Sequence, residues 1–222
     1  MAAINIVAIL GFVITLLCCN PISSLIREKG KEENSQDKSY LVLLWIIFGA
    51  AFVARIIAAA VYKGNDTDMN CFLIWSQNVF DEGISKFYLS DSFHDYPPGY
   101  MYILYVVGAI RALFSWTWDS KASIVLTKLP AIIADMFTAY LIFKIASKRL
   151  KKSGAAFLSA VYLFCPMVIL DSAVWGQTDS VFTVFMVLMC YLITEKKLIL
   201  SYFVFAIGIL IKPQSLFFTP VL

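Results

Sequence analysis

Charged residues are scarce in this sequence of 222 residues. They make up 15% of the chain, whereas soluble domains contain about 25%. Apolar residues make up 60%, against about 45–50% in soluble domains, and the mean hydropathy is +0.79. A water-soluble fold cannot bury this much apolar surface. The sequence therefore predicts a polytopic membrane protein, whose solvent is mostly lipid.

The sequence also lacks the features of nucleic-acid-binding, metal-binding and disulfide-rich proteins. The net charge is only +3, and no basic cluster is interleaved with aromatic residues, which excludes a nucleic-acid partner. The chain has a single histidine, and its five cysteines show no CxxC or Cys/His spacing. We interpret these cysteines as small buried hydrophobic residues. They are Cys18, Cys19, Cys71, Cys165 and Cys190.

Seven apolar stretches are long enough to cross a bilayer, since a spanning helix needs about 20 residues, with a usual range of about 17–25. These stretches favour an all-α fold with several transmembrane helices. They cover residues 2–19, 40–62, 98–116, 123–147, 154–174, 178–194 and 198–222.

Basic residues between the stretches indicate which of them cross the membrane. They gather in the linkers 20–39 and 147–153 and in the pair Lys196-Lys197. The positive-inside rule places all three groups in the cytoplasm. If every stretch crossed, the odd number of stretches between the first two linkers would put these linkers on opposite sides. One stretch must therefore stay on one side of the membrane.

The stretch 98–116 is the best candidate for a helix that does not cross. It begins with prolines, contains Arg111 and is rich in tyrosine and tryptophan, a pattern typical of amphipathic helices at the membrane interface. We therefore expect about six transmembrane helices with the N-terminus outside. One long outer segment, 63–122, then carries interfacial helices.

This topology divides the chain into two parts. Residues 1–39 are expected to form an extra N-terminal transmembrane helix and its cytoplasmic linker, and residues 40–222 the main membrane module. Because the sequence ends inside an apolar run at Leu222, we expect further helices beyond it.

The outer segment is rich in acids, and Asp66 and Asp68 lie at the start of a helical pattern. From Asp68 to Phe80 the apolar positions follow one helical face, with Thr67 or Asp68 as the expected N-cap. The two aspartates fit either solvated loop and cap positions or a functional site. Their D-x-D spacing also suits a divalent cation, although two carboxylates are a weak signal, so no cofactor is firmly implied.

The sequence Asp95-Tyr96-Pro97-Pro98 predicts a rigid corner. Proline fixes φ and disfavours helix in the residue before it, which excludes a helix at Tyr96. The corner therefore orients the side chains of Asp95 and Tyr96. Its simplest role is to start the next helix, because proline suits the first helical turn.

Several charged residues lie inside the apolar stretches. Lys128 and Asp135 are seven residues apart, about two helical turns, and so share one helix face. A charge at the bilayer centre costs at least about 2.5–3.5 kcal/mol, so such residues usually face a cavity or a partner. A structural pair between Lys128 and Asp135 is the plain alternative to a site. Convergence on the outer side favours a site, formed by Asp68, Asp95, Lys128, Asp179 and Lys212.

Five sequence motifs follow one another along the chain: Asp68 followed by Trp75, DYPPGYMYIL, KLPAIIAD, AVWGQTDS and IKPQ. Over about residues 40–218 they resemble the GT-C membrane glycosyltransferases, above all bacterial proteins similar to the second mannosyltransferase of GPI-anchor synthesis. The dolichyl-phosphate-glucose-dependent glucosyltransferases of the N-glycan pathway are more distant. The resemblance implies a polyprenyl-phosphate sugar donor, mannose as the sugar and Asp68 as catalytic base. Because such proteins are usually longer, it also implies that this chain is their N-terminal module.

The polar residues suit an inverting transfer. One carboxylate takes the proton of the acceptor hydroxyl as it attacks the anomeric carbon, and the departing lipid phosphate needs positive charge nearby. Asp68 is the expected base. The expected substrate-binding residues are Asp66, Asp95, Tyr96, Trp175, Gln177 and Asp179, and the expected phosphate-binding residues are Lys128, Lys212 and Arg111.

Two other functions fit the same pattern. Charged residues that face a cavity, together with proline-broken helices, also describe a transporter or flippase of a lipid-linked or polar substrate. The lack of an internal repeat and the gathering of acids on one side count against it. A non-catalytic GT-C-like subunit is the third interpretation. For the transferase we expect a bacterial plasma membrane location, with membrane lipid, the sugar donor and a glycan, lipid or protein acceptor as partners.

Overall fold

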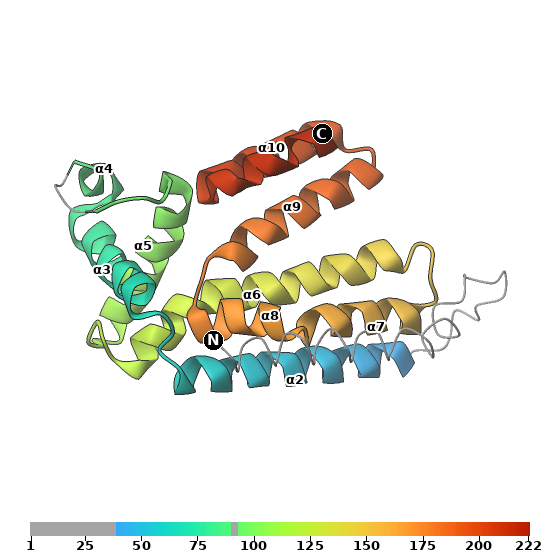
Figure 1. Ribbon diagram of the computed structural model, residues 1–222, viewed down its shortest axis with the longest axis horizontal. Helices are drawn as coiled ribbons and strands as arrows, with labels where there is room; N and C mark the ends of the chain where they lie inside the picture. The colour runs from blue at the N-terminus through green and yellow to red at the C-terminus, as the bar shows by residue number, and fades with distance from the viewer. Residues whose placement is uncertain (1–38, 90–92) are drawn as a thin grey trace, which may run out of the picture.

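The computed structural model describes residues 39–89 and 93–222, and every regular element there is helical (Figure 1). The first predicted apolar stretch and nearly all of the first basic linker lie outside the described residues. The elements are α2 (Ser39–Val61), α3 (Asp66–Glu82), α4 (Ile84–Phe87), α5 (Pro98–Leu113), α6 (Lys121–Ala146), α7 (Lys152–Leu163), α8 (Pro166–Ile169), the π-helix η1 (Leu170–Trp175), α9 (Asp179–Thr194), α10 (Leu198–Ile211) and the 3-10 helix η2 (Pro213–Val221).

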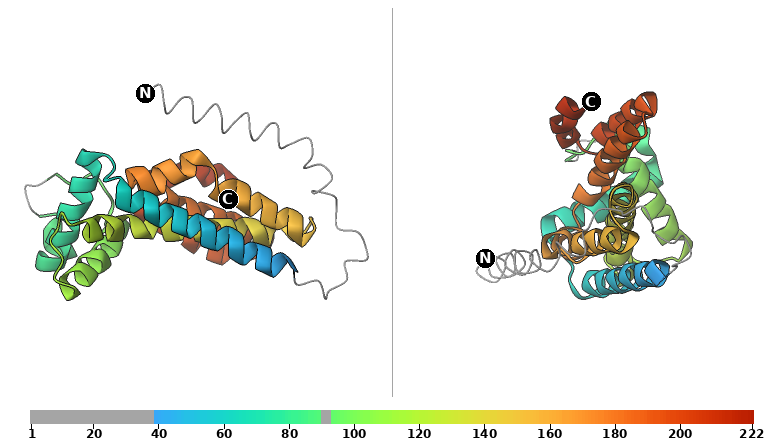
Figure 2. Two further views of the ribbon diagram at one scale, coloured as in Figure 1. Left: turned by 90° about the horizontal axis from the view of Figure 1, so that it is seen from below. Right: turned by 90° about the vertical axis from the view of Figure 1, so that its right-hand side faces the viewer.

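The helices form a bundle with a smaller cluster at one end. Helix α2, helix α6 and the row made by α7, α8 and η1 run side by side, while α9 packs on α6 and α10 packs on α9 (Figures 1 and 2). The short helices α3, α4 and α5 gather at the end where α2 finishes and α6 begins (Figure 1). We call these three helices the outer cluster, because they lie within the predicted outer segment 63–122.

The opposite end of the bundle is basic. The α6–α7 and α9–α10 connections both lie there, and Lys148 of the first forms an ion pair with Glu195 of the second. The Lys148 ammonium also lies 5.1 Å from the centre of the Tyr191 ring. Lys196 and Lys197 follow directly in the chain. Two of the three basic linkers thus meet at one end, in agreement with the charge pattern, and the outer cluster lies at the other.

Two of the described helices are long and apolar enough to cross a membrane, namely α2 from Tyr40 to Val61 and α6. The pair formed by α7 and α8–η1 is a third candidate, bent by 51° between Leu163 and Pro166. Proline explains the bend, because it lacks an N–H and disfavours helix in the preceding residue. Helices α5, α9 and α10 have 16, 16 and 14 residues. The described part of the chain therefore holds two or three helices of spanning length, and the predicted count of six is not confirmed.

The last apolar stretch does not form one continuous helix. Helix α10 ends at Ile211, Lys212 adopts an extended conformation with φ −152° and ψ 123°, and η2 begins at Pro213. The stretch 198–222 thus forms an α-helix that is about 21 Å long, at about 1.5 Å per residue, followed by a 3-10 helix. The proline again accounts for the break.

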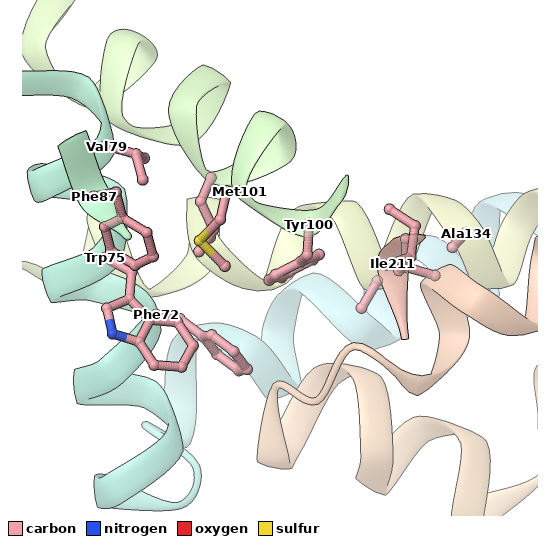
Figure 3. Packing of buried hydrophobic residues seen from close by; sticks show 11 residues of the cluster. Phe72, Trp75, Val79, Phe87, Tyr100, Met101, Ala134 and Ile211 are labelled. Carbon is pink, nitrogen blue, oxygen red and sulfur yellow. The ribbon is translucent and has the colours of Figure 1, made fainter. Parts of the chain in front are cut away.

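An aromatic core ties the outer cluster to the bundle. Helix α3 buries the face predicted from the sequence, which includes Phe72 and Trp75. The Phe72 ring packs edge-on against Tyr100 of α5, with 5.6 Å between ring centres. The same core reaches Ala134 of α6 and Ile211 of α10 (Figure 3). The start of α3 is therefore held in a fixed place relative to the ends of the bundle helices.

The N-cap of α3 is Asn65, and the prediction of Thr67 or Asp68 at this position is wrong. The Asn65 side chain accepts hydrogen bonds from the backbone N–H groups of Thr67 and Asp68, at 3.0 and 3.2 Å. Asparagine is a favoured cap because its short side chain reaches these unpaired N–H groups. The cap leaves the Asp68 carboxylate free for contacts outside the helix.

A buried ion pair links α2 to α6. Arg55 Nε donates to Asp135 Oδ2 at 3.1 Å, and both side chains are fully buried. Asp135 also accepts hydrogen bonds from the hydroxyls of Tyr162 in α7, at 3.1 Å, and Ser172 in η1, at 2.6 Å. The alternative pairing of Asp135 with Lys128 is wrong, because Lys128 donates to backbone carbonyls instead.

We predict that α5 does not cross the membrane. Glu82 precedes this helix and Ser120 follows it, whereas Ser147 lies at the far end of α6. In a chain with its native cysteines replaced, Glu82→Cys and Ser120→Cys should both react with an impermeant maleimide on intact cells. Ser147→Cys should react only after permeabilisation. Labelling of Ser120→Cys only after permeabilisation would show that α5 crosses.

We also predict that the Arg55–Asp135 pair is stabilising only as a pair. Arg55→Met alone should lower the free energy of unfolding by about 3–5 kcal/mol, because it leaves a buried carboxylate without its cation. Adding Asp135→Leu should restore much of the loss. Thermal unfolding of the detergent-solubilised protein measures both. Lys148→Met, in the partly exposed pair with Glu195, is the control and should cost about 0–1 kcal/mol. Equal losses in the single and double Arg55 variants would contradict the interpretation.

Candidate active site

A cavity of about 920 Å³ opens where the outer cluster meets the ends of η1, α9 and α10. Segments far apart in the sequence form its wall: the start of α3, the corner before α5, the η1–α9 turn and the start of η2. The charged residues in this wall are four aspartates and one lysine. The lining residues are Asp68, Asp95, Tyr96, Pro97, Asp171, Trp175, Gln177, Asp179, Lys212, Pro213, Gln214, Leu216 and Phe217.

Two long-range hydrogen bonds hold the Asp68 carboxylate at the edge of this cavity. Its Oδ2 accepts from Trp175 Nε1 at 2.7 Å and from Gln177 Nε2 at 2.6 Å. Both donors come from the segment 175–177, far from α3 in the sequence, so they fix the orientation of the carboxylate. Asp68 is therefore a fixed hydrogen-bond acceptor that lines the cavity.

The turn after η1 brings both of these donors to Asp68. Gly176 has a left-handed conformation, with φ +88°, and a Cβ at this position would lie 2.5 Å from Met69 Cε. Only glycine satisfies both conditions without strain. The N–H groups of Gly176 and Gln177 both donate to the Asp171 carbonyl, at 2.9 and 3.0 Å. This closed turn presents Trp175 and Gln177 to the start of α3.

Tyr96 extends the hydrogen-bond chain to the corner before α5. Its hydroxyl donates to Gln177 Oε1 at 3.3 Å and accepts from Thr178 Oγ1 at 3.4 Å. Its ring packs edge-on against Phe72, with 5.5 Å between ring centres. Burial raises the pKa of the Tyr96 phenol, so the hydroxyl keeps its proton and remains a donor. Asp95, the residue before it, lines the cavity as predicted.

Lys212 supplies positive charge to the cavity. The break at Pro213 turns its side chain inward, where its ammonium forms an ion pair with Asp179 at the start of α9. The same ammonium lies 5.9 Å from the ring centres of both Tyr96 and Phe182, within the range of cation–π attraction. Of the five residues predicted to converge, four line this cavity and Lys128 does not; the four are Asp68, Asp95, Asp179 and Lys212.

Asp171 lines the cavity although it is not among the residues predicted for the site. It lies in η1 within an apolar stretch, four residues before Trp175. The available signal was its spacing, because residues one helical turn apart share a face. The π-helical geometry of η1 has no comparable signature in the sequence.

Three predicted residues lie away from the cavity. Asp66 forms an exposed ion pair with Lys63 at 2.9 Å. Arg111 is buried at the end of α5 and donates to Gln77 of α3. Lys128 is fully buried within α6, and its ammonium donates to three backbone carbonyls. The expected contacts of Lys128 and Arg111 with a lipid phosphate therefore find no geometric support.

The described residues contain no group of three or more His, Cys, Asp or Glu side chains arranged to hold a metal ion. Asp66 and Asp68, the pair with divalent-cation spacing, have different partners: Asp66 contacts Lys63 and Asp68 contacts Trp175 and Gln177.

A protein-family model described as dolichyl-phosphate-mannose-protein mannosyltransferase matches residues 95–222, more than half of the chain. Together with the apolar helices and the polar cavity, this match defines a membrane glycosyltransferase of the GT-C type. The chain belongs to the dolichyl-phosphate-mannose-protein mannosyltransferase family. No curated protein and no solved structure shows a significant match to it.

The family match confirms the GT-C class that the motifs indicated. Its description points to protein mannosyltransferases, whereas the motifs resemble relatives of GPI-anchor synthesis. The matched region includes Tyr96, Gln177 and Lys212. It begins at Asp95, so Asp68 lies outside it.

Proposed function

We propose that the protein transfers a hexose, mannose in keeping with its family, from a polyprenyl-phosphate donor to an acceptor hydroxyl. The reaction takes place at the outer face of a bacterial plasma membrane and inverts the anomeric centre. One observation carries this proposal: Asp68 is fixed at the edge of a polar cavity by Trp175 and Gln177, with the Lys212 ammonium lining the same cavity. A base and a cation in one cavity match the two requirements of the reaction.

Asp68 acts as the general base in this mechanism. As the acceptor oxygen attacks the anomeric carbon, its proton passes to the Asp68 carboxylate, and the bond from that carbon to the lipid-phosphate oxygen breaks. A base must lie within hydrogen-bond reach of the proton that it takes. Two hydrogen bonds fix Asp68 Oδ2, so the carboxylate is held in place before the acceptor binds, and less reorganisation is needed during reaction.

Lys212 binds the donor phosphate. Within the described residues it is the cationic side chain that lines the cavity. Asp179 neutralises it in the absence of substrate, so an incoming phosphate has to compete with that carboxylate for the ammonium. Lysine serves well as a phosphate ligand because it is a compact point charge.

The remaining polar residues of the cavity bind the sugar and the acceptor. Asp95, Asp179 and Gln177 offer acceptors and donors for hydroxyl groups. Trp175, which is 47% exposed, offers an aromatic face for a sugar ring. A second, more apolar cavity of about 480 Å³ shares the Trp175 and Asp171 side chains with the first. It suits the first isoprene units of a lipid donor.

The family description supports a protein as the acceptor. The positive-inside rule, which predicts that the cavity end of the bundle is the outer one, supports transfer on the extracytoplasmic side. A transfer assay with defined polyprenyl-phosphate sugars and a panel of protein, glycan and lipid acceptors tests these assignments. Flipping of a lipid-linked sugar without transfer would instead favour the transporter interpretation.

We predict that Asp68→Asn lowers the turnover number by about 10²–10⁴-fold, the usual worth of a general base. Donor binding should change little, because the amide keeps the shape of the side chain. The measurement is the initial rate of sugar transfer in membranes at saturating donor. Asp66→Asn is the matched control, since Asp66 lies two residues away and pairs with exposed Lys63; it should retain nearly full turnover. A turnover of Asp68→Asn close to that of the wild type would exclude Asp68 as the base.

We also predict that Lys212→Gln raises the KM for the lipid donor by about tenfold or more, since a hydrogen bond to a charged group is worth about 1.5–3 kcal/mol. The KM for the acceptor should change much less. Lys148→Gln is the control, because Lys148 also pairs with a carboxylate but at the opposite end of the bundle. An unchanged donor KM in folded Lys212→Gln protein would exclude the phosphate assignment.

A further inference from the structure

Lys128 is a fully buried cation whose three ammonium hydrogens all face backbone carbonyls. Its Nζ lies 2.6 Å from the carbonyl oxygen of Tyr62, 3.0 Å from that of Ala173 and 2.9 Å from that of Val174. An ammonium group has three donors and no acceptor, so these contacts satisfy it completely. Lys128 therefore has no hydrogen-bond donor left with which to bind a substrate.

The three carbonyls belong to two helix ends. Tyr62 directly follows α2, and Ala173 and Val174 lie in the last turn of η1. The last carbonyls of a helix have no partner within the helix, and they carry the negative end of its dipole. Lys128, a buried cation of α6, donates to the carbonyls of both helix ends at once. It therefore joins the outer ends of α2 and η1 to α6.

We call the place where Lys128 meets the end of α2 and the end of η1 the junction. Its two glycines leave no space for an added Cβ atom. A Cβ added to Gly64, just after α2, would lie 2.2 Å from the Trp175 carbonyl oxygen and 2.8 Å from that of Val174. A Cβ added to Gly176 would lie 3.1 Å from Lys128 Cε. The chain that leaves α2 is thus in direct contact with the end of η1, and Lys128 lies against both.

The segments that leave this junction carry both sides of the Asp68 contact. The chain after Tyr62 runs through Gly64 into α3, which carries Asp68, and the chain after Val174 continues to Trp175 and Gln177. We infer that Lys128 is a positioning residue: by holding the outer ends of α2 and η1 together, it sets Trp175 and Gln177 against Asp68. Its effect on catalysis rests on the proposed function, whereas its effect on the geometry of Asp68 does not.

Fluorine NMR of protein labelled with 5-fluorotryptophan tests the geometry without any activity. Substitution to phenylalanine assigns the Trp175 and Trp75 signals, and Asp68→Ala gives the position of the Trp175 signal when the carboxylate acceptor is absent. Lys128→Met keeps much of the side-chain volume and removes the three donors. We expect its Trp175 signal to move towards the Asp68→Ala position and to broaden. The Trp75 signal should stay in place, because that indole donates to the Phe93 carbonyl in the outer cluster.

A second variant disturbs the same junction with Lys128 intact, and it decides the question if Lys128→Met fails to fold. Gly64→Ala pushes a methyl group into the Trp175 and Val174 carbonyls and should move the Trp175 signal in the same way. Gly83→Ala is the matched control: Gly83 also has a positive φ, +87°, but a Cβ there meets nothing within 4 Å. Its Trp175 signal should not move. An unchanged Trp175 signal in Gly64→Ala, or in folded Lys128→Met, would overturn the proposal.

Kinetics then separate this inference from the proposed function. In Lys128→Met we expect a turnover at least about tenfold lower, because misplacement of a reacting group by about 1 Å can cost about 10²-fold, with little change in donor KM. In an Asp68→Asn background the same substitution should cause little additional loss. A wild-type protein that transfers no sugar would refute the proposed function and leave the NMR result to decide on Lys128. A large additional loss in the Asp68→Asn background would show that Lys128 does not act through Asp68.

Discussion

A charge enclosed in a membrane-embedded bundle has to be matched inside the protein, and this requirement fixes how the helices surround α6. Asp135 is matched by Arg55 of α2 and by hydroxyls of α7 and η1. Lys128, two turns earlier on the same helix, is matched by carbonyls at the ends of α2 and η1. Each unpaired partner would cost several kcal/mol. Helix α6 therefore holds α2 and η1 at two heights, which leaves them little freedom to slide.

The packing around α6 also fixes the positions of the residues in the candidate site. Its key contacts join residues more than 100 positions apart, Asp68 with Trp175 and Gln177, and such contacts form only if both segments are already in place. The aromatic core around Phe72 fixes α3 from one side (Figure 3), and η1 is fixed from the other by α6. The cavity is the space left between two rigid supports, with polar side chains projecting into it from both.

Much of this architecture could be predicted because it depends on composition and periodicity. The apolar stretches, the buried face of α3, the break at Pro213 and the gathering of Asp68, Asp95, Asp179 and Lys212 all follow from such patterns. The role of Lys128 could not be predicted, because its partners are backbone carbonyls, which carry no sequence signal. Similarly, Asn65 and Thr67 are both acceptable caps, and only the packing of α3 decides between them. The number of spans could not be fixed either, because apolar stretches broken by Pro166 and Pro213 fold into pieces shorter than the stretches themselves.

The hydrogen bonds around Gln177 all run in one direction. Thr178 donates to the Tyr96 hydroxyl, Tyr96 donates to the Gln177 carbonyl oxygen, and the Gln177 amide nitrogen donates to Asp68. An amide does not relay a proton between its oxygen and its nitrogen as a pair of hydroxyls would. The hydrogen-bond chain therefore offers no way for a proton to leave Asp68 through it. In the mechanism that we propose, a proton taken up by Asp68 has to leave through the cavity itself, so water reaching the vacated acceptor position would complete each reaction cycle.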